Sequence, residues 1–312
     1  MLKTDTGESG LSAIIDIGSN SCLLLIARRL PGGSLDVRLD RSTVTRLSQG
    51  AAQTGTLRAD AVARTLSCLK QYAEIAREHG ARPRAVATEG LRMVTNPEVF
   101  LEPAAAILGD PVQLISGDEE ARLSYLSVAL EYDEARDLRV LDIGGGSTEL
   151  VVGHGHEVRS SMSHAVGSVR LTEAHVHQDP PSAASVAAME AAVRAAFARQ
   201  PLSPFPQLHG LAGTITSSAA LILELPRYER SRVDQATFGA AAIRKLRDRL
   251  MHETLLDRSA YPSLGQGRAD VIVAGVTILL VALEHCGAET LVVRDRGLRY
   301  ALLPCHAEVS ES

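Results

Sequence analysis

Two short stretches of the chain nearly repeat each other, and this repeat limits the possible folds more than any other feature. The first reads Ile-Ile-Asp-Ile-Gly-Ser-Asn-Ser over residues 14–21, and the second reads Val-Leu-Asp-Ile-Gly-Gly-Gly-Ser-Thr-Glu over residues 140–149. Each has an apolar run, an aspartate, a turn rich in glycine and hydroxyl groups, and a second apolar run. A single copy is most simply a tight hairpin with a turn aspartate. Two copies at domain-sized spacing predict a duplicated fold that binds one ligand from both sides.

The two turns have the residue types of phosphate-binding sites. The apolar residues before each aspartate are typical of a buried strand, and the apolar run after each turn predicts a hairpin, not a strand–helix loop. Glycines let the backbone approach a ligand closely, and successive N–H groups in such a turn bind anions. The candidate phosphate-binding residues are Gly18, Ser19, Asn20 and Ser21 in the first turn and Gly144, Gly145, Gly146, Ser147 and Thr148 in the second.

The carboxylates beside these turns suggest a magnesium site. Mg²⁺ prefers oxygen ligands and bridges phosphate oxygens, so a carboxylate at a strand end has an evident role there. Asp142 and Glu149 are the best candidates, because a hairpin can bring both to the same mouth, and Asp16 is expected to face them across a cleft. The alternative is that Glu149 is a solvated carboxylate at a strand end.

Composition and spacing exclude several classes of protein. Neither turn has the spacing of a P-loop or of a dinucleotide-binding fingerprint. The net charge of −5 argues against a dedicated duplex-DNA binder. No apolar run is long enough to span a membrane, and the polar start of the chain does not have the pattern of a signal peptide. The scattered cysteines (Cys22, Cys68, Cys286 and Cys305) are expected to be free thiols. We therefore expect a cytoplasmic protein that binds neither DNA nor a membrane.

Hydrophobic spacing predicts strands and helices in both halves, and a length of 312 residues allows two domains. The domain joint is expected between residues 122 and 136, which gives domains 1–125 and 126–312. The main predicted helices cover 59–79, 97–108, 118–132, 182–199, 215–223, 237–252 and 268–285, and residues 88–96 are expected to be loop. The main predicted strands cover 13–39, 84–87, 112–115, 138–152, 157–163, 208–211 and 290–293.

With both turns and residues 116–122 considered, the chain resembles the exopolyphosphatase/guanosine pentaphosphatase (Ppx/GppA) family over nearly its whole length. The segments at 16–21 and 142–149 match two phosphate motifs of that family. Ala-Thr-Glu-Gly-Leu-Arg at 87–92 and Ser-Gly-Asp-Glu-Glu-Ala-Arg at 116–122 are similar to its other site segments. The resemblance implies an α/β fold of two duplicated ribonuclease-H-like domains, of the actin-like ATPase superfamily, with an interdomain cleft.

The resemblance also implies roles for particular residues. Glu120 would orient or deprotonate the attacking water, and Arg92 would clamp the terminal phosphate. Gly213 and Thr214 fit a further family segment and join the candidate phosphate-binding set. From the residues alone, the acids at 118–120 are equally well first-turn residues that favour a helix dipole, and Arg92 is equally well a surface arginine.

Two positions depart from the family pattern. Glu89 stands where a small residue is more usual, so a second carboxylate is expected near the site. Arg-Tyr-Ala at 299–301 stands where the family has Arg-Glu-Gly, which weakens any role for the missing glutamate.

The function implied by the resemblance is a Mg²⁺-dependent exopolyphosphatase that releases orthophosphate from the end of inorganic polyphosphate, in a homodimer. Guanosine pentaphosphate is the alternative substrate. An ATP-dependent small-molecule kinase is an alternative of another class, and a nucleotide-switched scaffold like actin leaves Glu120 and Arg92 unexplained. The arginines of 227–232 and the basic segment 244–249 suggest a track for a chain of phosphates, although a solvated face is the simpler interpretation.

Overall fold

The computed structural model describes residues 10–31, 33–132, 135–265 and 267–304. Within these ranges the chain forms two compact α/β units. The first contains the residues up to Ser116 together with those from Leu298 onward, and the second runs from Gly117 to Gly297. Each unit has its own mixed sheet and its own hydrophobic core.

The first unit is built on a five-stranded sheet with the order β3-β2-β1-β4-β5. Antiparallel pairing joins β1 to β2 and β2 to β3, whereas β4 is parallel to β1 and β5 is parallel to β4. Ile17 pairs with Cys22 across the first glycine turn, which confirms the predicted hairpin. The strands are β1 (Ser12–Ile17), β2 (Ser21–Arg29), β3 (Leu35–Val44), β4 (Pro83–Ala87) and β5 (Gln113–Leu114).

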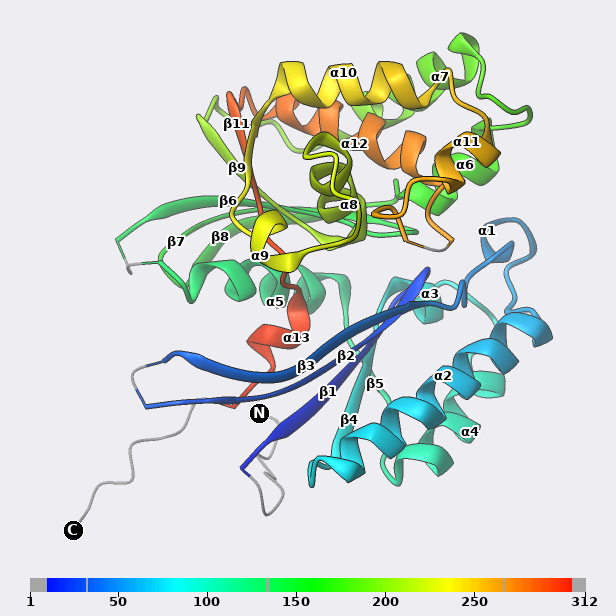
Figure 1. Ribbon diagram of the computed structural model, residues 1–312, viewed down its shortest axis with the longest axis vertical. Helices are drawn as coiled ribbons and strands as arrows, with labels where there is room; N and C mark the ends of the chain where they lie inside the picture. Colours follow the sequence, from blue (N-terminus) through cyan, green and yellow to red (C-terminus); the bar gives the residue numbers. More distant parts are fainter. Residues whose placement is uncertain (1–9, 32, 133–134, 266, 305–312) are drawn as a thin grey trace. The chain divides into compact units, whose positions relative to one another are not determined.

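Two long helices of the first unit lie side by side along its sheet, α2 (Ala59–Glu78) and α4 (Glu98–Leu108) (Figure 1). Both confirm helices predicted from apolar spacing. Three short helices complete the unit: α1 (Ala51–Thr54), α3 (Glu89–Arg92) and α13 (Leu298–Ala301). The prediction of loop throughout 88–96 was wrong, because α3 forms one helical turn there.

The second unit is built on a six-stranded sheet with the order β10-β11-β9-β6-β7-β8. Ile143 pairs with Thr148 across the second glycine turn, so this predicted hairpin is also confirmed. The strands are β6 (Asp137–Ile143), β7 (Thr148–His154), β8 (Glu157–His164), β9 (Gln207–Leu211), β10 (Thr237–Gly239) and β11 (Thr290–Val293).

Helices cover both faces of the second sheet (Figure 1). On one face α5 (Gly117–Ala129) packs against β6, β7 and β8, and on the other α12 (Ile272–His285) packs among four helices. Those four are α6 (Ser168–His175), α7 (Ala183–Phe197), α8 (Ala212–Ile222) and α10 (Ala240–Leu250), and the short helices are α9 (Arg230–Val233) and α11 (Leu255–Ser259).

Strand alternation decides which way the two turn aspartates point. Successive strand side chains point to opposite faces of a sheet. On β6, Leu138 and Val140 join the core beneath α5, whereas Leu141 and Ile143 join the core beneath α12. Asp142 therefore points toward α5. By the same alternation on β1, Asp16 shares the face of Ile14, which packs with Tyr300 of α13.

The compact units do not coincide with the expected domains 1–125 and 126–312. All of α5 packs on the second sheet, so the division falls before this helix and not within it. The chain from Leu298 returns to the first unit, where α13 packs on β1. Apolar spacing within one helix does not show which sheet the helix will cover.

Cys22, Cys68 and Cys286 are buried free thiols, as expected, and Cys305 lies outside the described residues. Across the ranges that the structure describes, no helix is long and apolar enough to cross a membrane.

An ion pair attaches α13 to the first sheet. Arg299, which is 4% exposed, donates to both carboxylate oxygens of Asp40 on β3 at 2.8 and 3.0 Å. The Tyr300 hydroxyl donates to the same carboxylate at 2.5 Å. Because Asp40 offsets the burial of the guanidinium, the pKa of Arg299 stays raised above its ordinary value although burial lowers it. The unusual Arg-Tyr-Ala segment therefore serves to dock the returning chain.

We expect Asp40→Ala to destabilise the protein by about 3–5 kcal/mol, because it leaves a buried guanidinium without its partner. The matched control is Asp36→Ala on the same strand, where the carboxylate pairs with the half-buried Arg28 and the exposed Arg38. That change should cost no more than about 1 kcal/mol. Urea unfolding followed by circular dichroism measures both, and equal losses would contradict a special role for Asp40.

Candidate active site

The first glycine turn is held by the loop that follows β3. The N–H groups of Thr45 and Arg46 donate to the carbonyl of Asn20 at 3.0 and 2.9 Å, and Ser48 N–H donates to the carbonyl of Ser19 at 3.1 Å. Within the described chain, the N–H groups of Ser19 and Asn20 donate to no protein acceptor. The carbonyls of Ser19 and Asn20 are thus used by the protein, while the N–H groups of these two residues are available to an anion.

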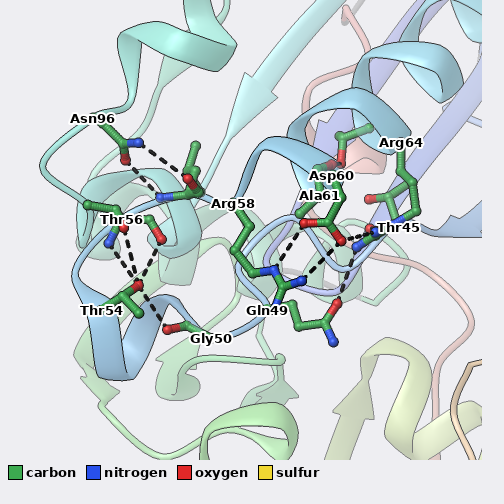
Figure 2. A network of polar contacts seen from close by, with 12 residues as sticks. Thr45, Gln49, Gly50, Thr54, Thr56, Arg58, Asp60, Ala61, Arg64 and Asn96 are labelled. Atoms are coloured by element: carbon green, nitrogen blue, oxygen red, sulfur yellow. Dashed lines mark hydrogen bonds and ion pairs between the residues drawn. The ribbon is translucent and has the colours of Figure 1, made fainter.

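A polar network fastens this loop to the start of α2 (Figure 2). Arg64 donates to the Thr45 carbonyl and to the Gln49 side chain, each at 3.2 Å, and to Asp60 at 2.8 Å. Arg58 donates to Asp60 from the other side at 3.0 Å. The two arginines lower the pKa of Asp60 to about 2, so its carboxylate stays ionised and available to both. The network fixes the loop after β3, which in turn holds the first glycine turn.

Three oxygen atoms around this turn are buried without a hydrogen-bond partner in the described structure: Asn20 Oδ1, Thr45 Oγ1 and Ser48 Oγ. Such groups are rare and costly in native proteins and often mark functional sites. Arg46, next to two of them, has a positive φ of 54°, which a non-glycine residue seldom adopts. The sequence motif ends at residue 21 and gave no sign of this second segment.

The short helix α3 packs directly on the first turn. A Cβ at Gly90 would lie 2.2 Å from Ser48 Oγ and 2.9 Å from Ser19 Oγ, so only glycine fits there without movement. Arg92 at the end of this helix donates to the Ile115 carbonyl at 2.7 Å. Glu89, the unusual carboxylate, is buried at the first position of the helix. Gly18, Ser19, Asn20, Ser21 and Arg92 are therefore gathered in one region of the first unit.

The second glycine turn packs on the N-terminus of α6. Val169 and Arg170 N–H groups donate to the Gly145 carbonyl at 2.9 and 3.0 Å, and Arg170 Nε donates to the Gly146 carbonyl at 2.8 Å. A Cβ at Gly167 would lie 2.4 Å from the Gly145 carbonyl oxygen. Within the described chain, the N–H groups of Gly145, Gly146 and Ser147 donate to no protein acceptor. Both turns thus have the same arrangement of engaged carbonyls and available N–H groups.

Three carboxylates lie together beside the second turn. Asp142 ends β6, Glu149 lies near the start of β7, and Glu120 lies in the first turn of α5. Glu149 is 2% exposed and is within electrostatic reach of the other two. Burial raises the pKa of Glu149 well above its ordinary value, and the charges of Glu120 and Asp142 raise it further. The interpretation of Glu149 as a solvated strand-end carboxylate was wrong.

Glu120 differs from its neighbour Glu119, which is already engaged. Arg122 binds both oxygens of the Glu119 carboxylate at 2.8 and 2.9 Å, and this pairing lowers the pKa of Glu119. Glu120 instead interacts with the buried Glu149. Glu120 therefore lies with the carboxylates beside the second turn, whereas Glu119 is held in an ion pair with Arg122.

The carboxylates around Glu149 suit a hard cation that is shared with substrate. Across the ranges described, no group of three or more His, Cys, Asp or Glu side chains is arranged as a metal site of its own. Mg²⁺ usually keeps several waters and takes only one or two carboxylates, with phosphate oxygens from its substrate. Asp142 and Glu149 fit that requirement, because a cation would offset their mutual repulsion. Asp16 is 9% exposed and lies in the first unit.

The third predicted phosphate segment is packed more closely than the first two. A Cβ at Gly213 would lie 1.4 Å from Nη1 of Arg268, so this guanidinium covers the glycine directly. The Thr214 side chain packs against Gly275 of α12, and Ala212 has a positive φ of 71°. Thr214 thus has an evident packing role, and phosphate binding by Gly213 and Thr214 stays a prediction.

Several arginines of the suggested phosphate track are engaged with acids of the second unit. Arg244 pairs with Glu284 at 2.7 Å, and Arg247 pairs with Glu190 and Asp248. Arg230 donates to the Asp295 carbonyl at 2.6 Å. These pairings favour the simpler interpretation of a solvated, internally paired face.

Two serines that the sequence analysis did not single out contact the carboxylates. Ser124 Oγ donates to Asp142 Oδ2 at 2.7 Å, and Ser163 Oγ donates to Glu149 Oε1 at 2.6 Å. The position of each serine in the sequence could have identified its contact. Ser124 follows Glu120 by one helical turn, and Ser163 pairs with Glu149 across the hairpin of β7 and β8.

Known proteins are similar to this chain over most of its length. The chain is 37% identical over 304 residues to Exopolyphosphatase 2 of Mycobacterium tuberculosis, a match that covers 92% of this chain and 95% of that protein. The solved PPX-GPPA enzyme of Aquifex aeolicus is similar with a TM-score of 0.79 and 35% identity, over 94% of this chain and 98% of the other. A solved exopolyphosphatase-like protein is similar with a TM-score of 0.85 and 29% identity, over 94% and 97%.

These likenesses establish the actin-like ATPase fold that the sequence resemblance implied. The model of the Ppx/GppA phosphatase family matches residues 25–304, a range that includes Glu120, Asp142, Glu149 and both flanking serines. The chain is therefore a member of the Ppx/GppA phosphatase family.

Proposed function

We propose that this protein is an exopolyphosphatase that hydrolyses the terminal phosphoanhydride bond of inorganic polyphosphate and releases orthophosphate. The observation that carries the proposal is the grouping of Glu120, Asp142 and Glu149 beside a glycine turn whose N–H groups are available to an anion. The relative from Mycobacterium tuberculosis, which is named an exopolyphosphatase, supports the choice of substrate.

In the proposed reaction, a water oxygen forms a bond to the terminal phosphorus while the bridging P–O bond breaks, and the shortened chain leaves. Glu120 accepts the proton of this water, and the N–H groups of the second turn position the phosphate oxygens. A bound Mg²⁺, with Asp142 and Glu149 as ligands, would offset the negative charge of those oxygens. Phosphate binding by Arg92 and the first turn, which belong to the first unit, stays a prediction.

Phosphate release from polyphosphate tests this function directly. Orthophosphate should appear with polyphosphate and Mg²⁺, should stop when a chelator removes the metal, and should return when Mg²⁺ is restored. A parallel reaction with guanosine pentaphosphate identifies the alternative substrate, and ATP with small sugars identifies a kinase. Phosphate transfer to a sugar without phosphate release would overturn the proposal.

Glu120→Gln should lower kcat by roughly 10²–10⁴-fold, the usual range for a lost general base, and should leave KM for polyphosphate nearly unchanged. The matched control is Glu119→Gln, which removes a neighbouring carboxylate that already pairs with Arg122. Steady-state phosphate release measures both variants. A normal kcat for Glu120→Gln would assign the proton acceptor to another residue.

Glu149→Gln should abolish turnover but make the metal-free protein more stable at pH 8. The pKa of Glu149 is raised in the folded state, so this group stabilises the folded protein at low pH. That contribution to stability is lost as the pH rises above the ordinary pKa range of a glutamate. The amide has no charge to desolvate. We expect a Tm about 2–4 °C higher at pH 8, which corresponds to roughly 1 kcal/mol in a domain of this size.

At pH 5 the difference between Glu149→Gln and the parent should shrink, because the raised pKa of Glu149 favours the neutral form of the parent carboxyl as the pH falls. The control is Glu157→Gln, an exposed change on β8 that should alter stability by no more than about 0.5 kcal/mol. Thermal unfolding in a chelating buffer at both pH values decides the matter. A less stable Glu149→Gln protein at pH 8 would show that the carboxylate is not strained by burial.

A further inference from the structure

Two of the carboxylates beside the second turn, Asp142 and Glu149, are each held by a serine hydroxyl from a neighbouring element. Ser124, on α5, is fully buried and donates to Oδ2 of Asp142 at 2.7 Å. Ser163, on β8, donates to Oε1 of Glu149 at 2.6 Å, and Ser147 donates to the same oxygen at 2.8 Å. Both bonds to Glu149 use Oε1, so Oε2 is the oxygen that can reach a cation.

Ser124 also links two of the carboxylates. It lies one helical turn after Glu120 on α5, so the helix that presents Glu120 also fixes the orientation of Asp142. Side chains one turn apart lie on the same face of a helix, and therefore a shift of α5 would move the water-activating group and the Asp142 contact together.

Three nearby carboxylates repel one another, so their orientation does not follow from mutual attraction. A hydroxyl donor limits the rotation of a carboxylate, because it fixes one oxygen and so determines where the other oxygen points. Hydrogen bonds to a metal ligand from a second layer of residues typically change metal affinity or activity by 10–100-fold. Neither serine needs to touch substrate to have this effect.

We propose that Ser124 and Ser163 are positioning residues that orient Asp142 and Glu149 for binding a divalent cation. The inference rests on the proposed function, in which these carboxylates hold Mg²⁺. Ser124 should matter more than Ser163, because Ser124 is fully buried and a water reaches its place less readily. Ser163 is exposed, so a water can take over part of its hydrogen bond.

The test measures cation binding apart from catalysis. Mn²⁺ serves as the probe, and electron paramagnetic resonance reports its free concentration during titration of the full chain without substrate. Ser124→Ala should weaken Mn²⁺ binding by roughly 10–100-fold, and Ser163→Ala should weaken it by about 10-fold. Ser163→Thr keeps the hydroxyl and should bind like the parent.

Two controls remove serines of similar placement that contact no carboxylate. Ser127→Ala removes a second buried hydroxyl from α5, and Ser161→Ala removes a half-buried hydroxyl from β8. Both should bind Mn²⁺ like the parent and keep its Tm in chelating buffer. Should an alanine variant fail to fold, a cysteine at the same position replaces the hydroxyl with a much weaker donor and should also weaken binding.

The outcomes separate this inference from the proposed function. If either alanine variant that folds binds Mn²⁺ as tightly as the parent, that serine is not a positioning residue. If Ser163→Thr binds as weakly as Ser163→Ala, the shape of the side chain matters and not the hydroxyl, and the inference is overturned. If the parent releases no phosphate from polyphosphate but the Mn²⁺ series follows the expected order, the proposed function fails while the inference stands.

Discussion

The alternation of side chains along two strands determines where the candidate site residues lie. On β1 and β6 alternate residues face opposite sides of the sheet, and in each strand the last residue but one is an aspartate. The apolar residues of both strands fill the cores, which leaves each aspartate on a face opposite the larger helix layer. A slip of one residue in either strand would exchange the two faces and remove the aspartate from its place. Burial of the apolar positions therefore also fixes the site.

The face opposite the larger helix layer is covered by a different element in each unit. In the second unit it is α5, which carries Glu120 and Ser124. In the first unit it is the short helix α13, whose Tyr300 packs beside Ile14 and whose Arg299 is held by Asp40. The duplicated sheets thus have unequal coverings, and only the second covering supplies a catalytic candidate.

The cluster of carboxylates in the second unit costs free energy. A carboxylate that is 2% exposed and faces two like charges is unfavourable in the ionised form, which the raised pKa of Glu149 expresses. Three serine hydroxyls offset part of this cost through bonds of 2.6 to 2.8 Å to Asp142 and Glu149. A bound cation would offset the remaining negative charge. Strain of this kind is common where binding or catalysis needs a prearranged site.

The sequence by itself determined both hairpins and the long helices, because strand and helix periodicity and glycine turns are local properties of the chain. Asp142 and Glu149 became candidates from their places beside the second turn, whereas the fold class and Glu120 came from the resemblance to the Ppx/GppA family. Tertiary structure alone decided that α5 belongs with the second sheet and that α13 returns to the first, since one amphipathic helix can cover either sheet. It also decided that Ser48 and Gly90 meet at the first turn and that Ser124 and Ser163 hold the carboxylates. These contacts join residues that are distant in sequence or lie on different elements, and their partners are set by packing, which no single segment encodes.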